Sequence, residues 1–137
     1  MKLPALPLRL RILIGLLVVV TATVSAITFT MARLFHAVRR HLVREPDGQT
    51  LLYSYPDDSW LYLALPADDA TRFSVLVAGY FPPEFIQEML GALDVRRPGT
   101  VVLNLPFSTE SLRRTIEKGY DAVEETGQHR IYVRRET

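Results

Sequence analysis

Residues able to carry out acid–base, nucleophilic or metal chemistry are scattered along this chain, and their spacing builds no recognisable catalytic set. The absence of cysteine excludes thiol nucleophiles, disulfides and Cys-type zinc sites. His36 and His41 are five residues apart, so on a helix they point in different directions, and His129 is remote in sequence. No serine stands in a G-x-S-x-G setting. We therefore expect no catalytic residue, no metal site and no cofactor.

Two pairs of neighbouring acids are the remaining candidates for a cation site. The carboxylates of Asp57-Asp58 and of Asp68-Asp69 could in principle hold a divalent cation. Both pairs stand in turn-like positions near prolines, where an Asp side chain commonly bonds the local backbone. We favour the turn interpretation for both pairs. Asn104, within an apolar run, is expected to bond backbone at the end of a strand.

Aromatic residues crowd residues 53–81 and give the sequence its one candidate binding surface. Aromatic side chains on strands commonly form the core of a small domain, and this is the interpretation that we favour. Together with an acid and an arginine, they could also line a groove for a sugar or a lipid head group. The candidate binding residues of that groove are Tyr55, Asp58, Tyr62, Arg72 and Tyr80.

The charges divide the 137 residues into a basic head and an acidic tail, although the net charge is only +1. Residues 1–44 carry +7 and contain no acid, whereas residues 45–137 carry −6. Such a division is typical of a membrane boundary. The acidic tail argues against nucleic-acid binding, which requires a basic surface. Anionic lipid explains the basic head better.

The elements that must position these residues begin with a membrane segment. Residues 1–11 form a basic N-terminal tail, and residues 12–32 contain no charge. As a helix, these 21 residues span roughly 31 Å, which matches the hydrocarbon core of a bilayer. We expect a retained transmembrane helix. The alternative is a cleaved signal peptide, because Val24-Ser25-Ala26 is a passable cleavage site. Similar numbers of basic residues flank both ends, so charge alone does not fix the orientation.

Residues 33–45 are expected to extend the helix as a basic, amphipathic segment. An apolar stripe of Leu34, Phe35, Val38 and Leu42 recurs at helical spacing with arginines between its members. We expect the stripe to lie on the lipid surface or on a partner, with the guanidinium groups reaching toward lipid phosphates. The alternative is a simple basic flank that stops membrane transfer.

Residues 46–137 are predicted to form a small α/β domain in the order β-β-β-α-β-α-β with a partly parallel sheet. Helices separate the last three of these strands, so we expect those strands to pair in parallel. Helices are expected over residues 83–95 and 108–125, the second lined by Leu112, Ile116, Tyr120 and Val123, with Gly127 as its left-handed terminal residue. Strands are expected at Thr50–Tyr55, Trp60–Leu65, Phe73–Tyr80, Thr100–Leu105 and Arg130–Arg134.

Residues 55–104 contain five short motifs in this order: Tyr55-Pro56, Leu61-Tyr62, Thr71-Arg72-Phe73, Gly79-Tyr80 and Arg97-Pro98. In this order they resemble a soluble segment near the C-terminus of bacterial polytopic membrane glycosyltransferases, the enzymes similar to dolichyl-phosphate-mannose protein mannosyltransferases. The resemblance extends over about 80 of the 137 residues. Ala70 and Ala78 depart from it, because prolines are common in the family at both positions.

The resemblance implies a single-pass protein of the cell (inner) membrane whose residues 46–137 lie outside the cytoplasm, with residues 12–32 as the equivalent of the last membrane helix. The family's catalytic carboxylates lie in an early loop that has no counterpart here, so none can be transferred to this chain. The expected function is non-catalytic: to position an acceptor or a polyprenyl-phosphate sugar, as a fragment of such an enzyme or beside a polytopic partner. The alternatives are a bitopic interaction module of an envelope complex and a cleaved, exported domain.

Overall fold

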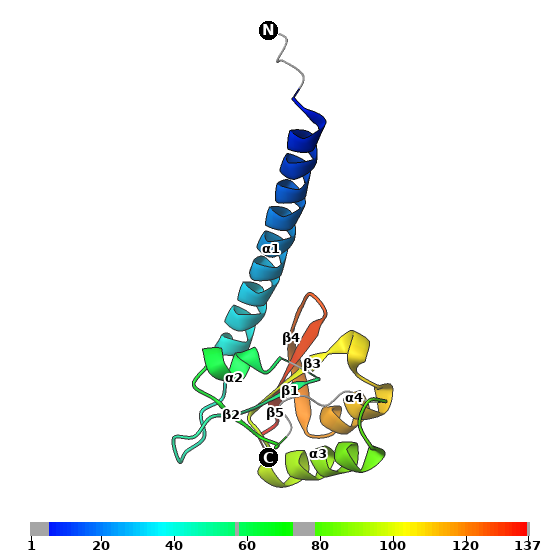
Figure 1. Ribbon diagram of the computed structural model, residues 1–137. Helices are drawn as coiled ribbons and strands as arrows, with labels where there is room; N and C mark the ends of the chain where they lie inside the picture. The colour runs from blue at the N-terminus through cyan, green and yellow to red at the C-terminus, as the bar shows by residue number, and fades with distance from the viewer. Residues whose placement is uncertain (1–5, 57, 73–78, 137) are drawn as a thin grey trace. The chain divides into compact units, whose positions relative to one another are not determined.

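The computed structural model describes residues 6–56, 58–72 and 79–136, and the chain forms two compact units, Met1–Arg33 and Leu34–Thr137 (Figure 1). Helix α1 (Leu8–Arg40) supplies all the described secondary structure of the first unit and continues into the second. Its apolar side chains before Arg33 are exposed, and its length and composition suit a membrane-spanning helix. This helix contains the predicted span at residues 12–32.

The second unit is built on a mixed five-stranded sheet in the order β2-β1-β3-β5-β4. Strand β1 pairs in parallel with β2 and β3, whereas β5 pairs antiparallel with β3 and β4. The strands are β1 (Leu51–Tyr55), β2 (Asp68–Asp69), β3 (Thr100–Asn104), β4 (Tyr120–Thr126) and β5 (His129–Arg134). The helices are α2 (Trp60–Ala64), α3 (Pro83–Arg96), the 3₁₀ turn η1 (Leu105–Phe107) and α4 (Glu110–Glu117). This architecture agrees with the predicted α/β class.

Alternate residues of the central strands face two separate cores, as the two-residue period of a strand requires. Tyr53, Val101 and Tyr132 belong to the core beneath α3 and α4, which we call the α3/α4 face. The opposite core, which we call the α1/α2 face, contains Leu52, Val102 and Ile131 and the buried residues of two helices: Leu34, Ala37 and Val38 of α1, and Leu61 of α2.

The apolar stripe of residues 34–42 therefore packs against the sheet of its own unit, instead of facing lipid or a partner. Val38 is fully buried, and Phe35 and Leu42 pack at the margin of the same core. Thr100 Oγ1 accepts the Val43 N–H at 3.2 Å and donates to the His41 carbonyl at 2.8 Å, which fixes the segment after α1 to β3. The sequence shows that the stripe must be covered, but it does not show which surface covers it.

The predicted strand at Trp60–Leu65 is wrong, because these residues form α2. Leu61 and Leu65 are both buried and lie four residues apart, whereas Leu63 between them is 92% exposed. That is a helical pattern, and the Leu61 N–H bonds the Asp58 carbonyl to begin the turn. The aromatic residues of this short run predicted a strand. The run folds as a helix instead, because a helix buries Leu61 and Leu65 on one side.

The predicted second helix is shorter than expected, and the last part of the domain is a hairpin. α4 ends at Glu117, and β4 and β5 are joined at Gly127, whose φ of +59° suits a tight turn. Tyr120 has the i+4 spacing from Ile116 that indicates a helix, yet it is buried as the first residue of β4. Because a hairpin delivers β5, this last strand is antiparallel to β3, not parallel as predicted.

Several other elements occur where they were expected. The strands at residues 50–55, 100–105 and 130–134 and the helix at 83–95 are confirmed within one or two residues. The helix opens with Pro83 in its first turn, where proline fits without loss of a hydrogen bond. The strand predicted at Phe73–Tyr80 falls largely on residues 73–78, which lie outside the described part of the chain.

Candidate functional site

The C-terminal end of α3 is the most unusual backbone position in the described residues. Arg97 ends the helix in the left-handed conformation, with φ 44° and ψ 64°, while its N–H bonds the Leu93 carbonyl at 2.9 Å. Glycine normally occupies such a position, since a Cβ there costs roughly 1–2 kcal/mol. The surroundings hold Arg97 in place, because Arg134 donates from its guanidinium to the Arg97 carbonyl. Backbone strain of this kind is concentrated at functional sites in proteins.

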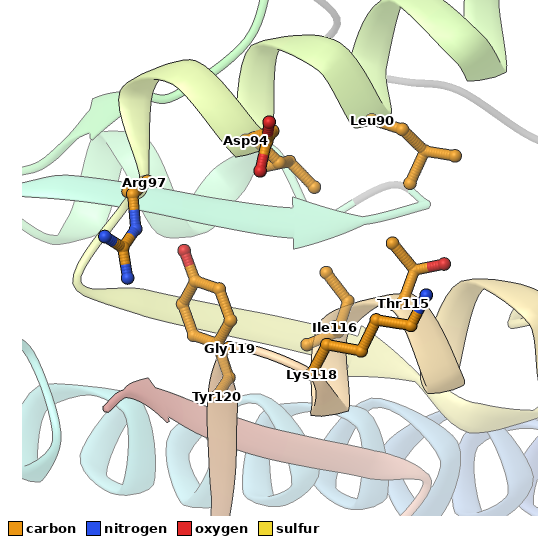
Figure 2. Close-up of a pocket in the computed structure, with 9 residues that line it drawn as sticks. Leu90, Asp94, Arg97, Thr115, Ile116, Lys118, Gly119 and Tyr120 are labelled. Atoms are coloured by element: carbon orange, nitrogen blue, oxygen red, sulfur yellow. The ribbon is translucent and has the colours of Figure 1, made fainter. Parts of the chain in front are cut away.

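Arg97 borders a pocket of about 650 Å³ on the α3/α4 face, between the end of α3 and the junction of α4 with β4 (Figure 2). This volume is in the range of small-molecule sites. Apolar side chains of both helices form part of its wall. The lining residues are Leu90, Leu93, Asp94 and Arg97 from the α3 side and Thr115, Ile116, Lys118, Gly119 and Tyr120 from the α4–β4 side.

Two cations and one acid line this pocket. Within the described residues, neither the Arg97 guanidinium nor the Lys118 ammonium has an ion pair or a hydrogen bond. Asp94 also makes no ion pair with a described residue. The charge lining the pocket therefore sums to +1, with both cations available to a ligand.

Tyr120 forms a wall of the pocket and is tied to the turn after α3. Its hydroxyl donates to the Pro98 carbonyl at 2.9 Å. Burial raises the pKa of Tyr120 to about 12, against the opposing effect of the nearby Arg134 and Arg97 guanidinium groups. The phenol therefore stays protonated at neutral pH, where it is a hydrogen-bond donor and not a base. The pocket is equipped to bind an anion and an apolar group.

A second polar cluster is buried at the ends of β1 and β3, on the α1/α2 face. Asp58 Oδ2 lies 3.0 Å from His129 Nε2 and accepts the Ser54 hydroxyl at 3.2 Å. All three residues are at least nine-tenths buried. Asp58 stands between the histidine and the serine, so the histidine is not placed to activate the serine as it would be in a catalytic triad. The cluster satisfies buried polar groups and ties β5 to the loop after β1.

The structure separates the tyrosines proposed as groove residues. Tyr55 is buried in the α3/α4 core, whereas Tyr62 belongs to the opposite core. The Tyr62 hydroxyl oxygen accepts the Ser54 N–H at 2.8 Å, and burial strongly raises the pKa of Tyr62. Ser54 thus links Tyr62 to Asp58, the two proposed residues that the fold brings close together.

Arg72 and Tyr80, the other two proposed binding residues, lie elsewhere on the surface. Arg72 forms an ion pair with Glu88 of α3 and lies over the ring of Phe85 at 5.4 Å. The Tyr80 side chain is 87% exposed. The described residues therefore place these five side chains in no common groove.

The expected turn role of the second acidic pair is confirmed for Asp69. Its Oδ1 accepts the Thr71 N–H at 2.8 Å, although Asp68 and Asp69 also form the short strand β2. Burial raises the pKa of Asp69. Among the residues that the structure describes, no three His, Asp or Glu side chains gather as a metal site.

Sequence reasoning missed Arg97, Lys118 and Asp94 as candidate binding residues. The Arg-Pro-Gly run correctly predicts the end of a helix, but it carries no sign that Arg97 is left-handed or that α4 faces it. Asp94 and Lys118 are 24 residues apart and are brought together only by tertiary packing. No protein-family model, curated protein or solved structure matches this chain.

Proposed function

We propose that this chain is a membrane-anchored, non-catalytic α/β module that works at a bilayer surface. The observation that carries the proposal is the shared use of α1. Its exposed apolar part suits a span, and its last turns supply buried residues to the core of the second unit. The apolar part and the residues that enter the core are therefore consecutive turns of one helix, with no loop between them.

The proposed setting is the extracytoplasmic side of the cell membrane, as part of or beside a lipid-phosphate-sugar-dependent glycosyltransferase. Support for this setting comes from the motifs of residues 55–104. In that role the module positions an acceptor or donor for a polytopic partner that supplies the catalytic carboxylates.

The test is to cross-link the full chain in source-cell membranes and identify what it captures. An antibody against residues 46–137 would first report the size of the native species. A band several times larger than 15.6 kDa supports the proposal, because the chain would then be part of a larger enzyme. A band at 15.6 kDa that is cross-linked to a polytopic glycosyltransferase also supports it. Capture of secretion or division proteins alone would overturn the glycosyltransferase setting, and release from membranes by carbonate would overturn anchoring.

The second candidate is an interaction module of an envelope complex, favoured by exposed apolar residues on the second unit. Tyr80 and Val95 are 87% and 82% exposed, and Val95 projects from α3. Single exposed apolar residues are common, so the cross-linking sites must separate the two proposals. Cross-links concentrated at residues 83–95 and 108–125, with an envelope protein as partner, would favour the second.

A further inference from the structure

We propose that the pocket between α3 and the α4–β4 junction binds a small organic phosphate, a ligand with a phosphate group on an apolar or ring-shaped body. This inference is independent of the glycosyltransferase setting, because it rests on the pocket alone. The pocket lies on the face of the sheet opposite the core that receives α1. Because charged and apolar groups both line the pocket, we assign it a water-soluble ligand that carries both kinds of group.

The phosphate is assigned to the Arg97 end of the pocket. Arg97 offers a planar set of donors suited to phosphate oxygens, whereas the Lys118 ammonium lies at the opposite end, beside Thr115, and adds only a longer-range positive charge (Figure 2). Neither cation is neutralised by a described residue, in contrast to Arg72, Arg130, Arg134 and Arg135 of the same unit, all of which form ion pairs.

The body of the ligand is assigned to the apolar wall. Leu90, Leu93 and Ile116 line the pocket together with the ring of Tyr120, so a ring or short alkyl group would remove apolar surface from water there. Asp94 contributes a carboxylate that accepts hydrogen bonds and repels a second anionic group. A ligand with a single phosphate and a neutral body fits these charges.

The left-handed backbone at Arg97 is the second observation that supports the site. Gly79, Gly48 and Gly127 occupy the other described positions with positive φ, whereas an arginine is kept at the mouth of the pocket. A structural helix end needs only the backbone conformation, which glycine provides more readily. The helix end therefore does not itself require an arginine side chain at residue 97, and its guanidinium is free to contact a ligand.

The test uses the full chain in nanodiscs of zwitterionic lipid, with phenyl phosphate as the probe and phenol and inorganic phosphate as its two halves. We expect phenyl phosphate to bind more tightly than either half, and to shift the NMR signals of the Ile116 methyl groups and the Gly119 amide. Binding of phenol as tight as that of phenyl phosphate would overturn the assignment of an anion. So would the absence of phenyl phosphate binding at millimolar concentration.

Three substitutions connect the binding to the two cations. Arg97→Gly is expected to weaken phenyl phosphate binding about tenfold, the usual effect of losing a charge-assisted hydrogen bond, and Lys118→Gln is expected to weaken it less, because it removes only a longer-range charge. Arg39→Gln is the matched control, because it removes the same charge from an exposed site outside the pocket. Because glycine tolerates the backbone at residue 97, Arg97→Gly is also expected to keep or raise the unfolding temperature. Unchanged binding in Arg97→Gly, or an equal loss in Arg39→Gln, would overturn the proposal.

Discussion

The helices that cover the two faces of the sheet in residues 34–137 differ in how completely they close those faces. On the α1/α2 face, residues of a long apolar helix converge with α2 on Leu52, Val102 and Ile131, and Val38 and Leu61 are completely buried. On the α3/α4 face, two amphipathic surface helices leave a pocket of about 650 Å³ between their ends. The comparison shows that the end of α1 and α2 close the first face, whereas the helices of the second face leave a pocket open.

The largest effect is expected from placing a charge on the α1/α2 face. Val38→Asp would bury an unpaired carboxylate and lower the free energy of unfolding by more than about 4 kcal/mol. Val95→Asp is the matched control: Val95 is exposed on α3, so its change should stay within about 0.5 kcal/mol. The measurement is denaturant unfolding in micelles, followed by fluorescence of Trp60, which packs against the α1/α2 core. Equal losses in the two variants would contradict the assigned role of α1.

The next largest effect concerns the buried polar cluster on the same face. Asp58→Ala leaves His129 and Ser54 without their shared acceptor, so we expect a loss of about 2–3 kcal/mol in the free energy of unfolding. Asp94→Ala, at the pocket of the other face, should change stability by less than about 0.5 kcal/mol. The same denaturant unfolding experiment compares them. A stable Asp58→Ala variant would mean that the cluster does not hold β5 to the loop after β1.

The next prediction concerns the loss of stability at high pH that is caused by buried tyrosines, Tyr120 on the α3/α4 face and Tyr62 on the α1/α2 face. Burial raises the pKa of Tyr120 to about 12 and raises that of Tyr62 further, so the folded state keeps protons that the unfolded state releases near pH 10. The stability due to Tyr120 is therefore complete below pH 10 and is lost as the pH rises from 10 to 12, by about 2 kcal/mol. Thermal unfolding across this pH range should show the decline, and Tyr120→Phe should reduce its slope. An unchanged slope would place the Tyr120 phenol in contact with solvent.

The smallest effect, and the one of opposite sign, is expected at the end of α3. Arg97→Gly relieves the left-handed backbone and should raise the free energy of unfolding by up to about 1 kcal/mol. Arg96→Gly should lower it by about 1 kcal/mol or more, because Arg96 lies within the helix and bonds the carbonyls of Asp69 and Ala70. Unfolding temperatures of the two variants measure this contrast between neighbouring arginines. A loss in both would show that the Arg97 side chain stabilises the fold.

The elements that could be predicted from the sequence are those with an unambiguous period or a strong terminator. The uncharged run within α1, the strand at Thr100–Asn104 and the helix between Pro83 and the Arg-Pro-Gly stop are of this kind. The sequence predicted a strand where α2 forms and a helix where β4 forms. In so short a run, one buried aromatic residue fits both the period of a strand and the period of a helix. Tyr120 shows this clearly, since its spacing from Ile116 fits a helix while its partner across the sheet is Arg134.

The candidate site could not be predicted, because its parts are assembled by packing. Asp58 was proposed as a binding residue, yet its partners Ser54 and His129 come from the first and last strands of the central sheet. The surface that covers the apolar stripe of α1 could not be predicted either, because it too is set by tertiary packing. Helical spacing shows that Leu34 and Val38 need an apolar partner, but only the fold identifies that partner as the chain's own sheet.

The role of α1 in the core has a consequence for the order of events during biosynthesis. Leu34 and Ile131 belong to one core although about 100 residues separate them, so translation at 5–20 residues per second leaves α1 without β5 for roughly 5–20 seconds. During that interval β1 and β3 are made and can supply Leu52 and Val102, but the core around Leu34, Ala37 and Val38 still lacks Ile131. The stripe at the end of α1 therefore stays incompletely covered until the final hairpin is made.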